Sequence, residues 1–480
     1  MFSNVKHRNV FNFFSEISQI PRGSGNEKAI ADYLVNFAEK RGLKCVRDKV
    51  NNIFITKAAS SPEMENSLPI LLQGHTDMVC EALPTVEHDF LKDPIKFVRK
   101  GDRLFADGTT LGADNGVAVA IMLSILDSDD IAHPFIECLF TVGEEVGMDG
   151  MHAFDTSLLT SRKMINLDSA GEGIATVACA GGVRTDFSYS PESSPVSANE
   201  KVYSIKVSGL YGGHSGEDIN LGRYNAIECA ARILRSIGDD TAYRIISFTG
   251  GDKDNAIPRY CEVTIAVENH CNPTDIVSNC ECNITRELIN DDKNFSVECS
   301  EIDYLGNAVS YNDSIKLVDF LSLMRSGPVK MSPFIEGMVE TSYNLAVIRT
   351  DATSFKITVS SRSSVESSLD DMERLMASFG RIAGFREDTR GRYPGWQYAE
   401  ISPLRDTYLN TYRELFGKQG KAIGIHAGLE CGLLVQKVPD MDIISIGPDI
   451  KDLHSPSESL SISSLDRLYD IVLTILNKKN

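Results

Sequence analysis

Short apolar runs that lead within a few residues to acids or histidines limit the fold of this chain more than any other feature. Four such runs lie at Pro69–Gln73, Ile136–Val142, Met164–Leu167 and Ile443–Ile446. Unbroken apolar strands of this length are typical of a sheet that is covered on both faces. Because helical patterns alternate with these strands, the sequence predicts a largely buried α/β sheet.

Helices and further strands are predicted around these runs. The pattern Ser24-Gly25-Asn26-Glu27 has the form of a capping box and predicts a helix that ends near Lys40. A second helix, from about Gly116 to Leu126, follows Asp114. The remaining strands are predicted at Asn52–Thr56, Ile423–His426 and Leu433–Val435.

The middle of the chain has a different pattern, which favours an inserted domain over residues 183–395. It shows alternating strands and amphipathic helices, but no strands that end in carboxylates. A strand–loop–helix unit is predicted twice, once around Gly212–Gly216 and once around Ser361–Ser364. We therefore expect a first domain made of residues 1–182 and 396–480, interrupted by an insertion of two similar halves.

Composition excludes several classes of protein. The 480-residue chain has a net charge of −19, whereas a nucleic-acid partner needs a surplus of Lys and Arg. No segment approaches the roughly 18 to 20 unbroken apolar residues of a membrane helix, and we expect no signal peptide. The 11 cysteines show no spacing of a disulfide framework or a zinc ribbon. These observations predict a cytoplasmic protein without membrane or nucleic-acid partners.

The charged residues that follow the predicted strands should meet at one edge of the sheet. His75, Glu145, Asp168 and His454 follow four different strands, and Asp114 stands at the start of a predicted helix. Two histidines and three carboxylates suit two divalent ions that share one carboxylate. Zn²⁺ is the first choice, with Co²⁺ or Mn²⁺ as alternatives. Asp114 is the natural bridge, although an acid there can equally cap the helix.

Two more acids extend this candidate site. Glu144 precedes a predicted ligand and is free to act as a general base on a water between the ions. Asp77 lies two residues after His75 and can fix the orientation of its imidazole. Each motif alone has an ordinary alternative, because Glu-Glu pairs are usually solvated and a His-x-Asp pattern often arises by chance. The prediction depends on their convergence at strand ends.

At these residues the chain resembles the aminoacyl-histidine (Xaa-His) dipeptidases of the di-zinc aminoacylase and exopeptidase superfamily. The segments Gly112–Gly116 and His426–Gly432 distinguish this group from related deacylases, and Asn115 stands where the wider superfamily more often has another acid or Met-Lys. The matching stretches run in the family's order over nearly the whole chain: IPRGSGNE, LQGHTDMV, DGTTLGADNGVAVA, TVGEEVGMDG, INLDS, GLYGGHSG, HAGLECGLL and IGPDIKDLHSPSE.

The resemblance implies a fold and a division of roles. The fold would be a catalytic α/β domain with a mixed central sheet, interrupted by an α+β lid domain. One zinc ion would be held by His75 and Asp168, and the other by Glu145 and His454. Asp114 would bridge them. Glu144 would be the catalytic base and then the proton donor, and Asp77 would orient His75.

Residues of the lid and of the later chain are further candidates from the resemblance. His214 would stabilise the tetrahedral oxyanion, unless it is only a loop residue between glycines. Arg362 could bind the terminal carboxylate of a peptide, or be a surface arginine. Asn255 and Asn344 are candidate polar contacts. Glu430 could anchor the free amine of a dipeptide, or be an acid at a helix N-terminus.

The function implied is hydrolysis of dipeptides with a free N-terminus, of the Xaa-His type and including β-alanyl-histidine. A tripeptidase or an N-acyl amino acid deacylase of the same superfamily is the first alternative. A metal-binding protein that has lost its activity is an alternative from another class. The partner implied is a small peptide, and the chain would be a monomer or a homodimer.

Overall fold

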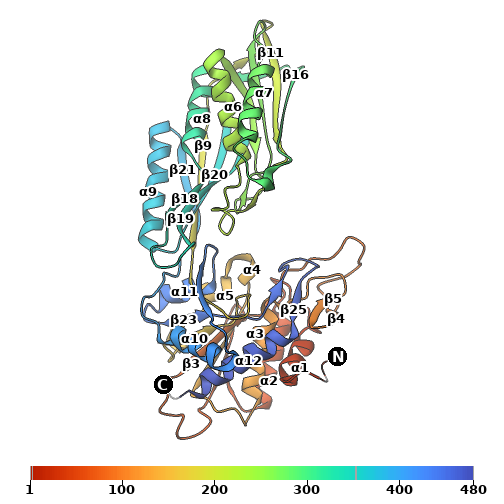
Figure 1. Ribbon diagram of the computed structural model, residues 1–480, viewed down its shortest axis with the longest axis vertical. Coiled ribbons are helices and arrows are strands. Elements are labelled where there is room, and N and C mark those ends of the chain that lie inside the picture. The colour runs from red at the N-terminus through yellow and green to blue at the C-terminus, as the bar shows by residue number, and fades with distance from the viewer. Residues whose placement is uncertain (1, 3, 352–353, 479–480) are drawn as a thin grey trace. The chain divides into compact units, whose positions relative to one another are not determined.

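The computed structural model describes residues 2, 4–351 and 354–478, and these divide into two compact units. The first unit contains residues 1–178, 398–424 and 429–480, and the second contains residues 179–397 and 425–428. Each unit has its own large sheet (Figure 1). The sequence predicts boundaries at 182/183 and 395/396, whereas the two units change over at 178/179 and 397/398. The sequence also does not anticipate that residues 425–428 join the second unit.

The first unit is built from helices and strands that alternate along the chain. Its helices are α1 (Arg8–Ile17), α2 (Lys28–Lys40), α3 (Ala113–Asp127), α4 (Glu144–Gly147), α5 (Asp149–Ala153), α10 (Pro403–Phe416), α11 (Glu430–Lys437) and α12 (Ile462–Asn477). Its strands are β1 (Lys44–Arg47), β2 (Ile53–Lys57), β3 (Ile70–His75), β4 (Phe97–Lys100), β5 (Arg103–Ala106), β6 (Ile136–Thr141), β7 (Lys163–Asn166), β8 (Ile174–Cys179), β22 (Lys421–Ile425), β23 (Asp442–Ser445), β24 (Ile450–Lys451) and β25 (Ser459–Ser461).

Eight of these strands form one mixed sheet in the order β1-β2-β6-β3-β7-β23-β8-β22. The four central strands β6, β3, β7 and β23 are parallel to one another. On either side, β2 and β8 run antiparallel to their neighbours. Every residue of β3 and β6 is buried, as expected for strands that are covered on both faces. The predicted mixed α/β sheet is confirmed, and its parallel strands end at one edge.

Helix α3 packs closely against β3 at the end of the strand that carries His75. Residues 116–126 of this helix are all buried, in agreement with their apolar sequence. A Cβ atom on Gly74 would lie 2.4 Å from the Cβ of Ala118 and 2.4 Å from the Oδ1 of Asn115. Glycine at position 74 is therefore what allows the helix to approach the strand.

The second unit is an antiparallel sheet with a layer of helices. The helices are α6 (Ala226–Asp240), α7 (Thr274–Thr285), α8 (Tyr311–Leu323) and α9 (Glu366–Ala383). The strands are β9 (Gly181–Tyr189), β10 (Ser193–Pro195), β11 (Glu200–Ser208), β12 (Gly213–His214), β13 (Tyr243–Gly250), β14 (Ala256–Ile257), β15 (Cys261–Glu268), β16 (Ser296–Ile302), β17 (Asn307–Val309), β18 (Gly327–Met331), β19 (Val339–Asp351), β20 (Ser354–Ser363) and β21 (Arg386–Tyr393).

The large sheet of this unit has the order β16-β11-β15-β13-β19-β20-β9-β21, with β18 added on β19. The helices contact one another in the order α7-α6-α8-α9, and α9 runs beside β9 and β21 (Figure 1). Both predicted strand–loop–helix units are present, as β11 followed by α6 and β20 followed by α9. The two halves of the sheet meet where Gly250 of β13 pairs with Ile348 of β19.

Two local predictions are wrong, each because a tertiary contact or a longer element overrides a short pattern. The apolar run Leu433–Val435 lies inside helix α11 instead of forming a strand. Helix α2 begins at Lys28, and Ser24 does not cap it. Instead, the Ser24 hydroxyl donates a hydrogen bond to the carboxylate of Asp77.

Over the described part of the chain, we find no helix that is both long enough and apolar enough to span a membrane.

Candidate metal centre and active site

The ends of the parallel strands bring the predicted acids and histidines together in the first unit. His75 is the last residue of β3, Asp168 follows β7 by two residues, and Glu144 and Glu145 open helix α4 just after β6. Asp114 lies at the start of α3, where residues 114 and 115 depart from helical geometry. Parallel strands present their carboxyl ends at one edge, and this common edge explains why residues distant in sequence converge.

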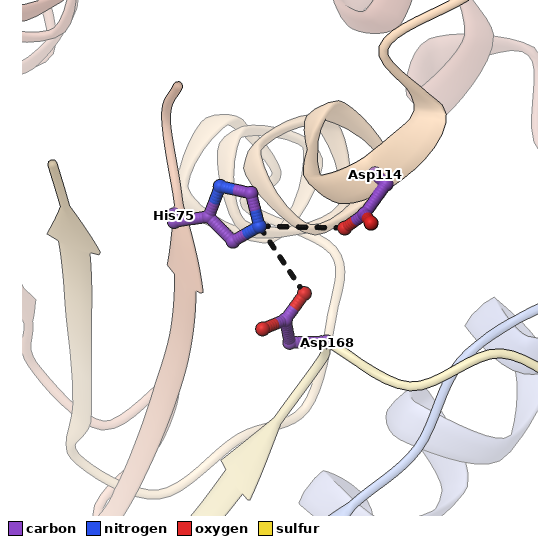
Figure 2. A group of neighbouring side chains, drawn as sticks. All are labelled: His75, Asp114 and Asp168. Atoms are coloured by element: carbon purple, nitrogen blue, oxygen red, sulfur yellow. Dashed lines mark ion pairs between the residues drawn. The ribbon is translucent and has the colours of Figure 1, made fainter. Parts of the chain in front are cut away.

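His75, Asp114 and Asp168 form the first cluster of side chains (Figure 2). The Nε2 atom of His75 lies 3.3 Å from Asp114 Oδ1 and 3.3 Å from Asp168 Oδ1. His75 is almost fully buried, at 1% exposure. The two carboxylates therefore converge on one imidazole nitrogen.

Asp114, Glu145 and His454 form the second cluster. The Nε2 atom of His454 lies 3.1 Å from Asp114 Oδ2 and 3.2 Å from Glu145 Oε1. His454 is in the loop between β24 and β25, and its backbone is left-handed with φ of 59°. This histidine is half exposed, unlike His75. The two clusters share Asp114, which turns one oxygen to each histidine.

These donors fit a pair of divalent metal ions. Two ligand atoms about 2.0–2.1 Å from a tetrahedral zinc ion lie about 3.3 Å apart, which is the spacing between the ligand atoms of each cluster. Each cluster contains one imidazole, a good ligand for zinc, and carboxylates. The residues present therefore suit two ions, with Asp114 between them.

The acids of the two clusters favour the binding of positive charge among them. Burial alone would lower the pKa of His75, but the carboxylates of Asp168, Asp114 and Asp77 raise it well above its ordinary value. Hydrogen bonds to Asp114 and Glu145 raise the pKa of His454 to about 10. Burial raises the pKa of Asp168 to about 7, against the attraction of His75. A site with this many buried acids is stabilised by cations.

Asp77 is placed to orient His75. The Nδ1 atom of His75 lies 3.2 Å from the carbonyl oxygen of Asp77 and 3.3 Å from its Oδ1. The Nδ1–H group thus points to Asp77, which leaves Nε2 facing the carboxylates. Burial would raise the pKa of Asp77, but hydrogen bonds from His75 and Ser24, among others, lower it to about 2.

The carboxylate of Asp77 also supports the two neighbouring glutamates. It accepts the backbone N–H groups of Glu144 and Glu145, at 3.2 and 3.3 Å. Burial, together with the nearby acids Asp168, Glu430 and Glu145, raises the pKa of Glu144 well above its ordinary value, against the attraction of His75. A carboxyl group with a raised pKa is suited to accept and then return a proton.

Arg22 holds the loops around the site and was not singled out from the sequence. Its side chain is buried and donates hydrogen bonds to the carbonyl oxygens of Thr76, Asp77 and Gly112, at 3.0, 3.1 and 2.5 Å. It therefore ties the end of β3 to the start of α3. Its position in the stretch IPRGSGNE is the only sequence signal for this role.

Glu458 is a second residue that was missed. Its carboxylate is 2% exposed and accepts four successive backbone N–H groups, from Leu111 to Asp114, at 2.8 to 3.3 Å. It thus satisfies the first donors of α3 and fixes the loop that carries Asp114. Its signal in the sequence is an acid four residues after His454.

Glu430 lies beneath the site in the first unit and is fully buried. Its Oε2 atom accepts hydrogen bonds from Gln73 Nε2 at 2.6 Å and from Thr141 Oγ1 at 2.7 Å. A buried carboxyl offers no accessible atom to a substrate amine, so the structure does not favour the role suggested by the sequence.

In the second unit, Asn344 is also fully buried. Its Nδ2 donates to the carbonyl oxygen of Ala256 at 2.9 Å, and its Oδ1 accepts from Asn225 at 3.4 Å. These contacts favour a structural role for Asn344. Asn255 lies in the exposed turn before β14, and its carbonyl oxygen accepts the backbone N–H of Ser215.

His214 is held in one tautomer within the second unit. Its Nδ1 accepts the backbone N–H of Glu217 at 3.0 Å, so the proton of the neutral ring resides on Nε2. Burial and the charge of Arg362 lower the pKa of His214 to about 4. The side chain is therefore a neutral N–H donor at pH 7. A Cβ on Gly216 would lie 2.0 Å from the carbonyl oxygen of His426, so only glycine permits this loop.

Arg362 lies within β20 and is buried, not on the surface. It donates a hydrogen bond to the Tyr393 hydroxyl at 2.9 Å, and its Nε has no hydrogen-bond partner among the described residues. His426 is buried nearby and bonds to Ser342 Oγ at 2.7 Å. Burial and the charges of Arg362 and His214 lower the pKa of His426 to about 3. Arg362, with its unpartnered Nε, therefore favours the binding of an anion at this place in the second unit.

Comparison with known proteins assigns the class of this chain. The model of peptidase family M20/M25/M40 matches residues 71–478, and the chain belongs to this family. It is a hydrolase that acts on peptide bonds. Among curated relatives, the cytosol non-specific dipeptidase of Escherichia coli is 34% identical over 99% of this chain and 98% of its own length.

Solved structures agree with this assignment. The aminoacylhistidine dipeptidase of Vibrio alginolyticus matches with a TM-score of 0.91 and 33% identity, over 99% of this chain and 97% of that one. The aminopeptidase PepT of Bacillus cereus matches with a TM-score of 0.57 and 16% identity, over 98% of both chains, and shows the fold alone. The resemblance to dipeptidases that was read from the sequence is confirmed.

Proposed function

We propose that this peptidase hydrolyses dipeptides with a free N-terminus, of the Xaa-His type and including β-alanyl-histidine, with two divalent ions. The observation that carries the proposal is Asp114, whose two carboxylate oxygens face two different histidines at 3.3 and 3.1 Å. The similarity to dipeptidases over nearly the whole chain supports the substrate class. Because the printed name of the Escherichia coli relative places that protein in the cytosol, we propose a cytoplasmic location.

The chain offers a distinct set of ligands for each ion. His75 and Asp168 would hold one, Glu145 and His454 the other, and Asp114 both. Zn²⁺ fits best, and Co²⁺ or Mn²⁺ are compatible with the same donors. When bound, the ions acidify a water and polarise the peptide carbonyl. Asp77 accepts a hydrogen bond from the Nδ1–H of His75, and this would leave Nε2 free to bind an ion.

Glu144 moves the protons of the reaction. Its carboxylate takes a proton from the attacking water, and the resulting carboxylic acid gives it to the amine that leaves when the peptide bond breaks. A raised pKa is needed for the second step, because an ordinary carboxyl group would lose the proton to solvent. The backbone contacts with Asp77 keep Glu144 and Glu145 in fixed relative positions.

The second unit supplies contacts to the substrate in this proposal. His214 donates its Nε2–H to the oxyanion that forms at the carbonyl. Arg362 binds the terminal carboxylate, with its unpartnered Nε as one donor. Asn255 remains a candidate polar contact. The insertion is long enough to contain two strand–loop–helix units, which supports donation of His214 by the same chain. A monomer and a homodimer are therefore both compatible with the proposal.

A substrate panel combined with one substitution tests the function. Purified protein loaded with Zn²⁺, Mn²⁺ or Co²⁺ should hydrolyse Ala-His and β-Ala-His, but not N-acetyl-Ala-His or a tripeptide. The Glu144→Gln variant should bind two ions per chain with unchanged affinity, while kcat falls by about 10²-fold or more because the proton carrier is lost. Glu145→Gln, one residue further, is the matched control and should weaken ion binding itself.

Other results would assign another function. Hydrolysis of only the acetylated compound would indicate a deacylase, and preference for the longer peptide a tripeptidase. A protein that binds ions but cleaves none of the panel would be a metal-binding protein without activity. If Glu144→Gln kept kcat within tenfold of wild type, Glu144 would not be the base.

A further inference from the structure

A row of polar side chains crosses the apolar sheet of the first unit directly beneath the ligand-bearing strand ends. Gln73 of β3 pairs with Asn166 of β7, Asn166 with Ser445 of β23, and Ser445 with Thr176 of β8. All four are buried, at 0 to 2% exposure. Neither the proposed metal ligands nor the proton carrier is part of this row.

The row is aligned with the proposed metal ligands. Side chains two residues apart on a strand project from the same face of a sheet. Gln73 is two residues before His75, and Asn166 is two residues before Asp168. On β3 the row therefore lies on the face from which His75 projects, and on β7 it ends the strand two residues before Asp168.

The hydrogen bonds in the row run in one direction and end at Glu430. The Ser445 hydroxyl donates to Asn166 Oδ1, and Asn166 Nδ2 donates to Gln73 Oε1 at 2.5 Å. Gln73 Nε2 then donates to Glu430 Oε2 at 2.6 Å. Thr141, the last residue of β6, donates to the same oxygen at 2.7 Å. One carboxyl group thus accepts directly from residues of two strands, β3 and β6, and ends a chain of hydrogen bonds that begins on β23.

The row also reaches the backbone of a ligand. Asn166 Oδ1 accepts the backbone N–H of Asp168 at 3.2 Å. The orientation of the Asn166 carboxamide depends on Gln73, and that of Gln73 depends on the acceptor at Glu430. A buried carboxamide that loses its acceptor must turn or leave donors unsatisfied, which costs free energy either way.

We propose that Glu430 is a positioning residue of the metal centre: through Gln73 and Asn166 it fixes the strand ends that carry His75 and Asp168. This inference rests on the proposed metal centre. Burial raises the pKa of Glu430 to about 8, and its Oε1 atom has no hydrogen-bond partner among the described residues. A glutamine, which keeps one oxygen acceptor, is therefore its closest substitute.

Substitution of Glu430 tests the proposal with ion affinity as the first readout. The Glu430→Ala variant should bind Zn²⁺ at least tenfold more weakly in competition with a chelator, and kcat for Ala-His should fall at least tenfold while KM changes less than threefold. Glu430→Gln should restore both values to within about threefold of wild type. Thr141→Val removes the hydrogen bond to Glu430 and the one that Thr141 Oγ1 accepts from Gln73 Nε2 at 3.1 Å, with little change of shape. It should shift ion affinity and kcat in the same direction by a smaller factor, because Gln73 keeps its bond to Glu430.

A matched control separates positioning from stability. Ile165→Val trims a fully buried residue of β7 next to Asn166, so it lowers the melting temperature without touching the row. It should keep wild-type ion affinity and kcat. If Glu430→Ala and Thr141→Val lose only thermal stability, as this control does, the positioning role is wrong. If the wild-type protein binds no divalent ion, the proposed metal centre itself fails.

Discussion

Individual buried side chains of this protein have environments that differ sharply from water, and His426 is the clearest case outside the metal centre. It is 5% exposed and contacts Ser342, with Arg362 and His214 as its charged or titratable neighbours. Its folded pKa of about 3 lies below the value of about 6.5 expected in the unfolded chain. The unfolded state therefore binds a proton more readily, and stability is lost as the pH falls below 6.5.

This imbalance predicts an acid-sensitive second unit. One histidine of this kind should lower the free energy of unfolding by about 2 kcal/mol between pH 7.5 and pH 5. Urea unfolding can be followed by the fluorescence of the single tryptophan, Trp396, which lies in the second unit. The His426→Gln variant should show a correspondingly smaller loss over this range. An unchanged pH dependence would contradict the assignment, and His270→Gln, at an exposed site of the same unit, is the control.

The residues that sequence analysis could and could not find differ in the range of their contacts. His75, Glu145 and Asp168 stand out because each comes within three residues of the end of a short apolar run, which is a local pattern. The contacts of Arg22 and Glu458 depend on partners as many as 90 and 347 positions away. No local pattern encodes such contacts, so these residues appear in matched stretches without a visible role.

At the scale of elements, the strands were easier to predict than the helix ends. The core strands are short and apolar, so their pattern alone identifies them. Ser24 stands in the sequence pattern of a helix cap, but its hydroxyl group donates a hydrogen bond to the carboxylate of Asp77 instead. The run Leu433–Val435 is apolar and short, and periodicity cannot distinguish a strand from a buried turn of helix at that length. The halves of the insertion were visible because each repeats strand, loop and helix.

The start of helix α3 provides the prediction at this scale. Replacing Glu458 by alanine leaves four backbone N–H groups without their acceptor, and it should lower the free energy of unfolding of the first unit by about 3 kcal/mol. Because this loop carries Asp114, Zn²⁺ affinity should also fall. Circular dichroism in urea and chelator competition measure the two effects, with Glu65→Ala at an exposed position as control. Unchanged ion affinity in Glu458→Ala would show that the loop holds Asp114 without this cap.

The whole molecule consists of two units with separate sheets, and this organisation has a thermodynamic consequence. All the proposed metal ligands lie in the first unit. A ligand that binds only the folded form stabilises it by about 2.7 kcal/mol at 100 times its dissociation constant. Saturating Zn²⁺ should therefore raise the unfolding temperature of the first unit specifically.

The position of Trp396 makes this selectivity measurable. Far-ultraviolet circular dichroism reports both units, whereas tryptophan fluorescence reports the second. Addition of Zn²⁺ should shift part of the circular dichroism transition to a higher temperature and leave the fluorescence transition within about 1–2 °C of its original midpoint, since the ion ligands belong to the other unit. Equal shifts of both signals would show that the two units unfold together.

The long segment of the second unit begins and ends at neighbouring points of the backbone. Cys179 and Trp396 exchange two main-chain hydrogen bonds of 2.9 Å each, although 217 positions separate them. Residues 179–397 therefore leave and rejoin the first unit at one pair of adjacent residues, while residues 425–428 reach the second unit separately. The length or sequence of this segment can change by recombination at Cys179 and Trp396 while the order of strands in the first sheet stays the same. Chimeras of relatives joined at these two residues should therefore keep the first sheet folded.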